Sequence, residues 1–419
     1  MKLAARLDAL VDRERVRNYS IAFLALGVIA SILNVALAHS LRVLTGNALF
    51  PDFLAHWTAG RLLLDGNLAH LYDADFQANL QHAIIGPGDD VSWFVGPPFT
   101  ALLYVPFAAL PFPVAGVLWT LVSVVAIAAS LVLLKPLLPR LAQDWTVTVL
   151  AVLACQPVLE VIGAGQDSAI SMLVWAAGLR LLVAGRDALA GLVFGAGLIK
   201  PQLVLVAPPT FLIQRRWSAF VVWVAMALVA AAASVALVGV DGIHTWITTL
   251  TSERYDEQIN VGQAWKQLSA SALLVSIVPP ALVNAAQTVG LVLCAGLVVA
   301  FLVVAWRAPR ERWLDVWTLA ALTTVVASPH LLVYDLLIAV PAVLVLLDRH
   351  PSRRIRLALL AAFVLTYLNP LAHLLALKVS WPFTLVGAPW AVVPLLFLWY
   401  DALRACRQDP SPAPVPDPA

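Results

Sequence analysis

The sequence predicts an all-α membrane protein with about twelve transmembrane helices. Hydrophobic residues make up 61% of the 419 residues and charged residues only 12%, against roughly 25% charged in an average soluble domain. The mean hydropathy is +0.88, and apolar runs long enough to cross a hydrocarbon core of roughly 30 Å recur along the chain. This composition excludes a soluble enzyme or a disordered regulator, and the formal net charge of +2 provides no basic surface for nucleic acid.

Ten apolar runs are expected to form single spans. They are residues 20–41, 113–134, 145–162, 168–185, 217–240, 281–306, 313–328, 331–347, 355–372 and 383–400. The stretch 187–214 is either one long tilted helix or two short helices broken at Lys200-Pro201. The stretch 97–112 carries several prolines and is expected to lie along the surface instead of crossing.

The positive-inside rule chooses between the numbers of spans that these alternatives give. With 187–214 as a hairpin and both termini cytoplasmic, 20 of the 26 Lys and Arg residues fall on the cytoplasmic side. The long outer loops then cover about residues 42–112 and 241–280, and seven of the eight histidines lie on or near the outer face. Because ionisable groups at the membrane edge are usually functional, we expect the site to be extracytoplasmic. The expected location of the protein is a bacterial-type plasma (inner) membrane.

The chain is expected to form one integral membrane domain, residues 20–403, between two cytoplasmic segments. Residues 1–19 precede it, and the Pro-rich residues 404–419 form a disordered tail. The motif Ala36-Leu37-Ala38 resembles a signal-peptide cleavage site, but the preceding apolar run is nearly membrane-thick, which favours an uncleaved anchor. The three cysteines are far apart and indicate neither disulfides nor a metal site.

The first outer loop contains a predicted helix over residues 51–64, stopped by Gly66-Asn67. Asp52 and His56 lie four residues apart, so both side chains can point into one space. A carboxylate there is a candidate general base for a hydroxyl acceptor. The alternative is that Asp52 only caps the helix behind Pro51. Phe53, Trp57 and Leu64 share a face that is expected to lie in the membrane interface.

Lys200 is the strongest physical signal in the chain. Residues 187–199, at about 1.5 Å each, reach only about 20 Å of a roughly 30 Å core, so the hairpin tip lies inside the leaflet. An ammonium group there needs an anion, and a lipid phosphate is a natural one. The alternative is a lysine that snorkels to the headgroups.

Two further polar segments follow apolar spans on the outer side. Gly163–Ser168 is a turn in which Asp167 is explained by turn formation, while Glu160, in the preceding helical turn, is expected to be a structural partner. His330 and Asp335 are candidates for a proton relay or a substrate clamp, or for a satisfied pair that fixes two helices. Phosphate-loop, HExxH and GxSxG motifs are absent from the sequence.

Several of these motifs resemble those of glycosyltransferase family 87. They are Asp52-Phe53, Trp57 with Ala59-Gly60-Arg61, Gly66, Leu71-Tyr72-Asp73, Pro97-Pro98-Phe99, Gly165-Gln166, Lys200-Pro201-Gln202, and Ser328-Pro329-His330 with Tyr334-Asp335. The resemblance implies a GT-C fold, an active site at the non-cytoplasmic face and a polyprenyl-phosphate donor of mannose or arabinofuranose. The residues Phe94-Val95-Gly96 depart from the family, which more often places a tyrosine there.

The resemblance implies that Asp52 and His330 are catalytic, with Asp52 as the base in an inverting displacement that needs no metal. The residues expected to bind substrate are Arg61, Gln166, Lys200, His56 and Asp335. No cofactor is expected beyond the lipid-linked sugar donor, and the partners are a lipid or glycan acceptor and membrane lipids. The alternative functions are a flippase for a polyprenyl-linked glycan and a structural subunit.

Overall fold

The chain folds into helices throughout the part that is described. The computed structural model describes residues 10–37, 41–43, 46–88 and 92–407. Among these residues there is no β-strand, and two isolated bridges pair Arg42 with Ala48 and Gln267 with Leu332. The predicted all-α class is confirmed.

Five helices in the described ranges are long and apolar enough to cross a membrane. They are α2 (Arg13–Ala36), α6 (Phe112–Leu134), α12 (Trp217–Leu250), α15 (Val283–Arg307) and α18 (Arg353–Ala376). The pair α7 (Trp145–Leu153) and α8 (Gln156–Ala164), bent by 53°, would make a sixth span. The structure thus agrees with a membrane protein, and the number twelve stays a prediction.

The other predicted spans form shorter helices, which are α9 (Ser168–Val183), α16 (Trp313–Ala327), α17 (Ala339–Arg349) and α19 (Val392–Arg407). All residues of α16 except the first are buried, so this helix is covered by protein on every side. Its 15 residues reach about 23 Å at about 1.5 Å each. An apolar run is compatible with a buried core helix as well as with a lipid-facing span, and the sequence pattern does not separate the two.

Two ambiguous stretches are settled by the structure. Residues 187–214 form a hairpin of two short helices, α10 (Asp187–Ala196) and α11 (Ala207–Ile213), joined by 3-10 turns that meet at Lys200-Pro201. Within 97–112, helix α5 (Ala101–Ala108) is far too short to cross and packs against the helix of the first outer loop. Neither apolar stretch therefore forms one long helix.

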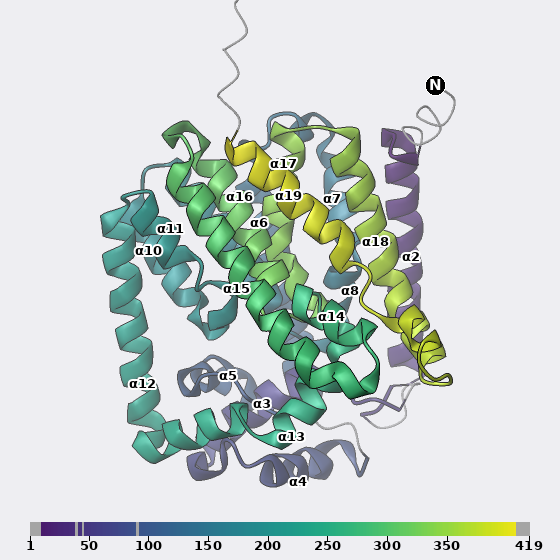
Figure 1. Cartoon of the computed structure of the whole chain (residues 1–419). Coiled ribbons are helices and arrows are strands. Elements are labelled where there is room, and N and C mark those ends of the chain that lie inside the picture. The colour runs from purple at the N-terminus through teal and green to yellow at the C-terminus, as the bar shows by residue number, and fades with distance from the viewer. Residues whose placement is uncertain (1–9, 38–40, 44–45, 89–91, 408–419) are drawn as a thin grey trace, which may run out of the picture.

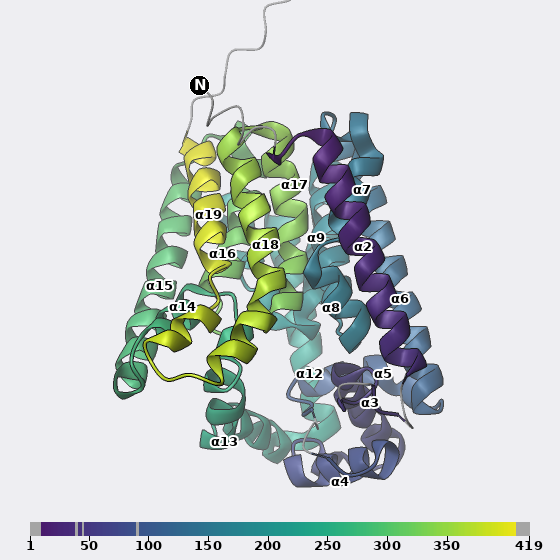
Figure 2. The same ribbon diagram turned by 90° about the vertical axis from the view of Figure 1, so that its right-hand side faces the viewer.

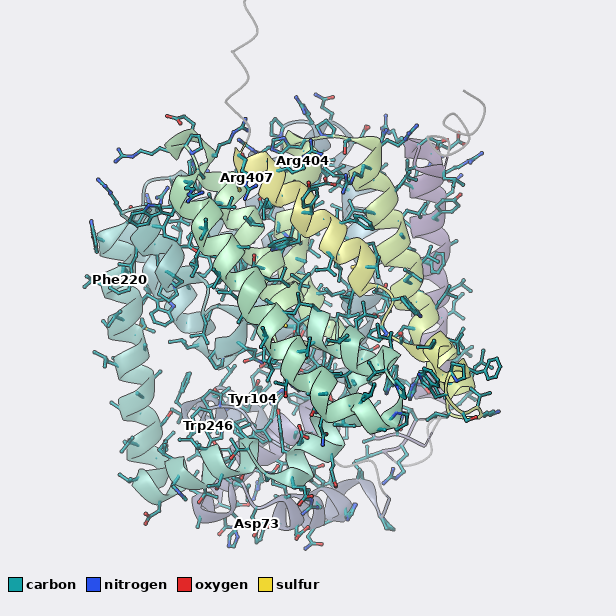
Figure 3. All side chains as sticks on the ribbon, viewed as in Figure 1. Asp73, Tyr104, Phe220, Trp246, Arg404 and Arg407 are labelled. Atoms are coloured by element: carbon teal, nitrogen blue, oxygen red, sulfur yellow. The ribbon has the colours of Figure 1, made fainter. Side chains whose placement is uncertain are left out.

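The short helices of the outer loops gather at one end of the bundle. Figures 1 and 2 place α3 (Pro51–Leu64), α4 (Ala74–Ile85), α5 and α13 (Glu253–Tyr255) there. The last part of α12 also turns along this end, after a kink at Gly239 with a φ of +67°. Figure 3 shows Asp73 and Trp246 at this end and Arg404 and Arg407 at the other. The prediction of a disordered tail from residue 404 is wrong for residues 404–407, which continue helix α19, and the rest of the predicted tail lies outside the described residues.

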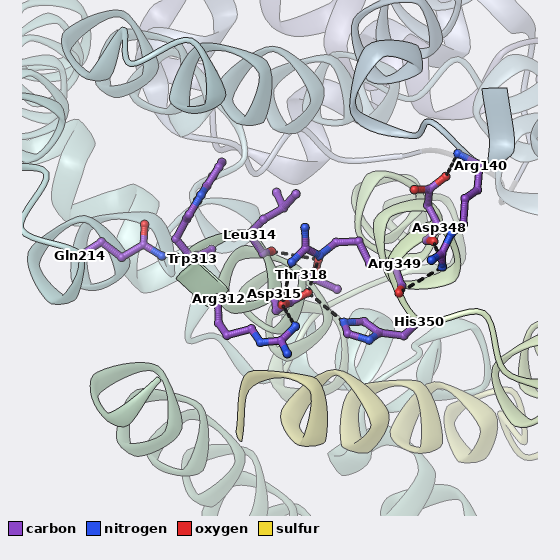
Figure 4. A network of polar contacts seen from close by, with 10 residues as sticks. All are labelled: Arg140, Gln214, Arg312, Trp313, Leu314, Asp315, Thr318, Asp348, Arg349 and His350. Atoms are coloured by element: carbon purple, nitrogen blue, oxygen red, sulfur yellow. Dashed lines mark hydrogen bonds and ion pairs between the residues drawn. The ribbon is translucent and has the colours of Figure 1, made fainter. Parts of the chain in front are cut away.

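A buried ionic network closes the end of the bundle that lies away from these loops (Figure 4). Asp315 of α16 is 2% exposed and pairs with Arg349 at 3.0 Å, His350 at 3.1 Å and Arg312 at 3.3 Å. Asp348 accepts from the backbone N–H of Arg140 at 2.8 Å. These contacts join α16 to α17, and α17 to the loop before α7.

Candidate active site

Helix α3 is packed into the protein and does not lie in the membrane interface. Phe53 is buried and stacks on Trp119, with ring centroids 5.5 Å apart. Trp57 is buried as well, and its Nε1 donates to the carbonyl of Leu110 at 3.2 Å. The expectation of an interfacial face is therefore wrong, because α5 and α6 cover these side chains. The packing fixes the direction in which the first turn of α3 points.

Asp52 lies in that first turn, where the side chain of Gln166 is close enough to lower its pKa. It is not the helix cap, since Phe50 occupies the N-cap position and no side chain bonds the first amides there. Burial raises the pKa of Asp52 above its ordinary value of 3.8, against the lowering effects of the Gln166 side chain and of the charges on Lys266 and Lys200. A carboxylate in this setting can accept a proton from a bound hydroxyl group.

The turn between α8 and α9 meets α3 at Gly165. This glycine has a φ of +74°, and a Cβ atom built on it would lie 2.6 Å from Cβ of Phe53. Only glycine combines the left-handed backbone with so close an approach. The next residue is Gln166, so the contact sets the distance between its amide and Asp52.

We expect Gly165→Ala to lower the free energy of unfolding by about 2–4 kcal/mol, because it adds left-handed strain and overpacks the contact with Phe53. Gly163→Ala is the matched control, since Gly163 lies in α8 with nothing within 4 Å of its would-be Cβ. That variant should be neutral or slightly more stable. Unfolding in mixed micelles measures both, and equal stability of the two variants would contradict the packing argument.

Lys200, at the tip of the α10–α11 hairpin, is enclosed by acceptors. Its Nζ lies 2.7 Å from Asp167 Oδ1 and 3.0 Å from Asp335 Oδ1. It also donates to Gln166 Oε1 and Ser168 Oγ, each at 3.0 Å, and Ser168 Oγ donates to Asp335 Oδ1 at 2.6 Å. The snorkelling alternative is wrong, because the ammonium turns toward carboxylates inside the protein. The anion that it needs is supplied by the chain itself.

His56 is brought to the same site, one turn along α3 from Asp52. Its ring stacks on Tyr104 with centroids 4.5 Å apart and an interplanar angle of 4°, and Tyr104 donates to Asp167 Oδ2 at 3.0 Å. Both ring nitrogens of His56 are buried, and neither makes a hydrogen bond of standard geometry in the described structure, although the Gln166 side chain lies close by. Burial lowers the pKa of His56 to about 4, so the ring is neutral at pH 7. A neutral imidazole with open nitrogens is suited to a sugar hydroxyl.

His330 and Asp335 both lie near this cluster but do not form the expected pair. Asp335 is engaged by Lys200 and Ser168, while Nδ1 of His330 is buried with no hydrogen-bond partner in the described structure. The His330 ring faces Tyr255, with centroids 6.2 Å apart. The interpretation as a satisfied His–Asp pair is therefore wrong, and His330 keeps a donor or acceptor for a ligand.

Arg61 is not brought to the cluster. It lies nine residues beyond Asp52 on α3, about 13 Å along the helix axis. Its guanidinium pairs with Asp65 at 2.8 Å, and the side chain is 40% exposed. Its predicted role in substrate binding has no support from this geometry.

Four polar side chains of the site were not proposed from the sequence for substrate chemistry, namely Tyr104, Glu160, Asp167 and Lys266. Asp167 was explained by turn formation alone, although a lysine inside the leaflet demands an acidic partner. The need of Lys200 for an acidic partner was thus the signal in the sequence that pointed to Asp167. Across the described ranges, no group of three His, Cys, Asp or Glu residues is placed to hold a metal ion.

The comparisons with known proteins give one match. The sequence model of glycosyltransferase family 87 matches residues 94–329. This range includes Tyr104, the Gln166–Ser168 turn, Lys200 and Lys266, and it ends one residue before His330. No curated protein and no solved structure matches the chain.

Proposed function

The chain belongs to glycosyltransferase family 87, and we propose that it transfers a sugar from a polyprenyl-phosphate donor to a hydroxyl group of a lipid or glycan acceptor. The sugar is of the mannose or arabinofuranose class, and the reaction takes place at the extracytoplasmic face. The observation that carries the proposal is the Asp52 carboxylate, which is aligned by Gln166 and lies among protein groups with unsatisfied hydrogen-bonding capacity.

The proposed reaction is a direct displacement at the anomeric carbon. The acceptor oxygen forms the new glycosidic bond while Asp52 takes its proton, and the bond from the anomeric carbon to the phosphate oxygen breaks with inversion. The electron pair stays on the phosphate, so the leaving group is a polyprenyl phosphate whose charge must be stabilised by nearby donors. Nδ1 or Nε2 of His330 is one such donor in this scheme.

Lys200 serves this scheme as a positioning residue. It donates to Oε1 of Gln166 at 3.0 Å, so the amide nitrogen of Gln166 is left to donate toward Asp52 and His56. A carboxylate that receives a hydrogen bond is favoured in its charged form, which is the form that acts as a base. The neutral ring of His56, one turn away, is proposed to bind a hydroxyl of the sugar or of the acceptor.

The test is to incubate the purified protein in nanodiscs with a panel of radiolabelled polyprenyl-phosphate sugars and a lipid-extract acceptor. We expect one donor to be consumed, with release of polyprenyl phosphate and a labelled product that contains a new glycosidic bond. Nucleotide sugars without the lipid are the control and should not react. Movement of intact lipid-linked sugar across the bilayer, with no polyprenyl phosphate released, would instead establish the flippase alternative.

A further inference from the structure

The donor phosphate needs a cation that is not already neutralised by the protein, a requirement that rests on the proposed function. Lys200 does not meet it. An ammonium group has three donors, and Lys200 already has four acceptors at 2.7–3.0 Å, two of which are carboxylates. A phosphate placed there would meet two buried negative charges beside one positive charge.

The other basic residues of the predicted outer face are held elsewhere or exposed, with one exception. Arg61 pairs with Asp65, Arg254 pairs with Asp75, Arg42 donates to the carbonyls of Gly46, Gly86 and Pro87, and Lys378 is exposed. The exception is Lys266, in the second outer loop. This lysine is half-buried, and no carboxylate oxygen in the described structure lies within 4.0 Å of its ammonium.

The backbone around Lys266 is fixed beside the Lys200–Asp335 cluster. Gln267 forms an isolated bridge with Leu332, and the N–H of Leu268 donates to the carbonyl of Leu331 at 2.9 Å. On the other side, Trp265 stacks on His373 with ring centroids 4.0 Å apart. The loop that carries Lys266 is therefore tied on both sides, to the segment that leads into Asp335 and to α18.

Lys266 also acts on the two carboxylates nearest the proposed reaction. Its charge interacts with Asp52 and with Glu160, yet neither carboxylate pairs with it at contact distance. The ammonium lies over the ring of Trp265, 5.1 Å from its centroid. This contact uses the positive charge but none of the N–H donors in hydrogen bonds to a carboxylate, so in the described structure the donors are left for another anion. The long lysine side chain holds a point charge that suits a phosphate oxygen.

We propose that the ammonium of Lys266 binds the phosphate of the polyprenyl-phosphate donor and stabilises the charge that develops when the sugar leaves. Lys266 and Asp52 then lie on the two sides of the anomeric carbon, one toward the leaving group and the other toward the acceptor. Lys200 contributes by holding Gln166 and does not contact the phosphate.

The experiment measures binding of polyprenyl phosphate, the sugar-free product, to the full chain in nanodiscs by native mass spectrometry. We expect Lys266→Gln to raise the Kd about 10- to 100-fold, as for loss of a charge-assisted hydrogen bond. Lys266→Arg should stay within about threefold of the wild type, and the KM for the donor should follow the Kd. Lys378→Gln is the matched control, because it removes an exposed lysine of the same predicted face, and its Kd should be unchanged.

The outcomes separate this inference from the proposed function. If the wild type transfers sugar and Lys266→Gln binds polyprenyl phosphate as tightly as the wild type, the assignment of Lys266 is overturned while the proposed function stands. If the wild type neither binds polyprenyl phosphate nor consumes any lipid-linked sugar, both are overturned. The unfolding midpoint of Lys266→Gln, measured in the same nanodiscs, must equal that of the wild type for weakened binding to count in favour.

Discussion

Asp52→Asn is expected to lower the rate of sugar transfer by about 10²- to 10⁴-fold, the range for loss of a general base. The substitution keeps the size of the side chain and removes the group that accepts the proton. Initial rates with the donor identified by the panel assay measure the effect. Asp65→Asn, at the far end of the same helix, is the matched control and should retain transfer, because Asp65 pairs with the exposed Arg61, away from the cluster.

The same variant is expected to fold at least as stably as the wild type. The folded-state pKa of Asp52 is raised by burial above 3.8, its ordinary value, so the folded protein binds a proton more tightly than the unfolded chain does. Stability therefore falls as the pH rises from 3.8 through the folded-state pKa, and Asn removes that cost. A folded variant that transfers sugar at the wild-type rate would remove Asp52 from the mechanism, and a variant that unfolds more easily than the wild type would contradict the predicted stability.

Lys200→Met is expected to have the largest effect on stability, a loss of about 3–5 kcal/mol. It leaves the carboxylates of Asp167 and Asp335, each 2% exposed, without the cation that compensates them. Removing one member of a buried ionic cluster costs more than removing the whole cluster. Thermal unfolding in detergent, followed by fluorescence or size exclusion, measures the loss.

The triple variant Lys200→Met, Asp167→Asn, Asp335→Asn is the matched comparison, since it removes all three charges at similar volume. It should recover much of the stability and remain inactive, because Gln166 loses the donor at its Oε1. Wild-type stability of the single variant would show that the cluster is not compensated in the way that its distances indicate.

The sequence predicted the elements around the site better than the contacts within it. The helix over 51–64 and the break at Lys200-Pro201 follow from local signals, namely a proline at the helix start and a run too short to cross the membrane. The buried position of Lys200 followed from the same length argument. Its partners did not, because Asp335 is 135 residues away in sequence and the pairing is set by tertiary packing.

The wrong predictions, like the unpredicted partners of Lys200, result from tertiary packing. Phe53 and Trp57 have the spacing of an interfacial face, but α5 and α6 cover them, and no local pattern indicates which surface a neighbouring helix will take. Arg61 belongs to a motif that includes Asp52, yet helical geometry separates the two by more than two turns. The number of spans stays open for a similar reason, since α16 is apolar because it is buried in the protein.

The ionic cluster around Lys200 has a consequence for the insertion of the chain into the membrane during synthesis. Asp167 leaves the ribosome before Lys200, whereas Asp335 follows 135 residues later, which at about 5–20 residues per second is a delay of about 7 to 27 s. A lysine that enters the bilayer alone costs about 2.5–3.5 kcal/mol. Asp167 is thus the partner that accompanies Lys200 during insertion, and Asp335 completes the neutralisation only once the later helices have arrived.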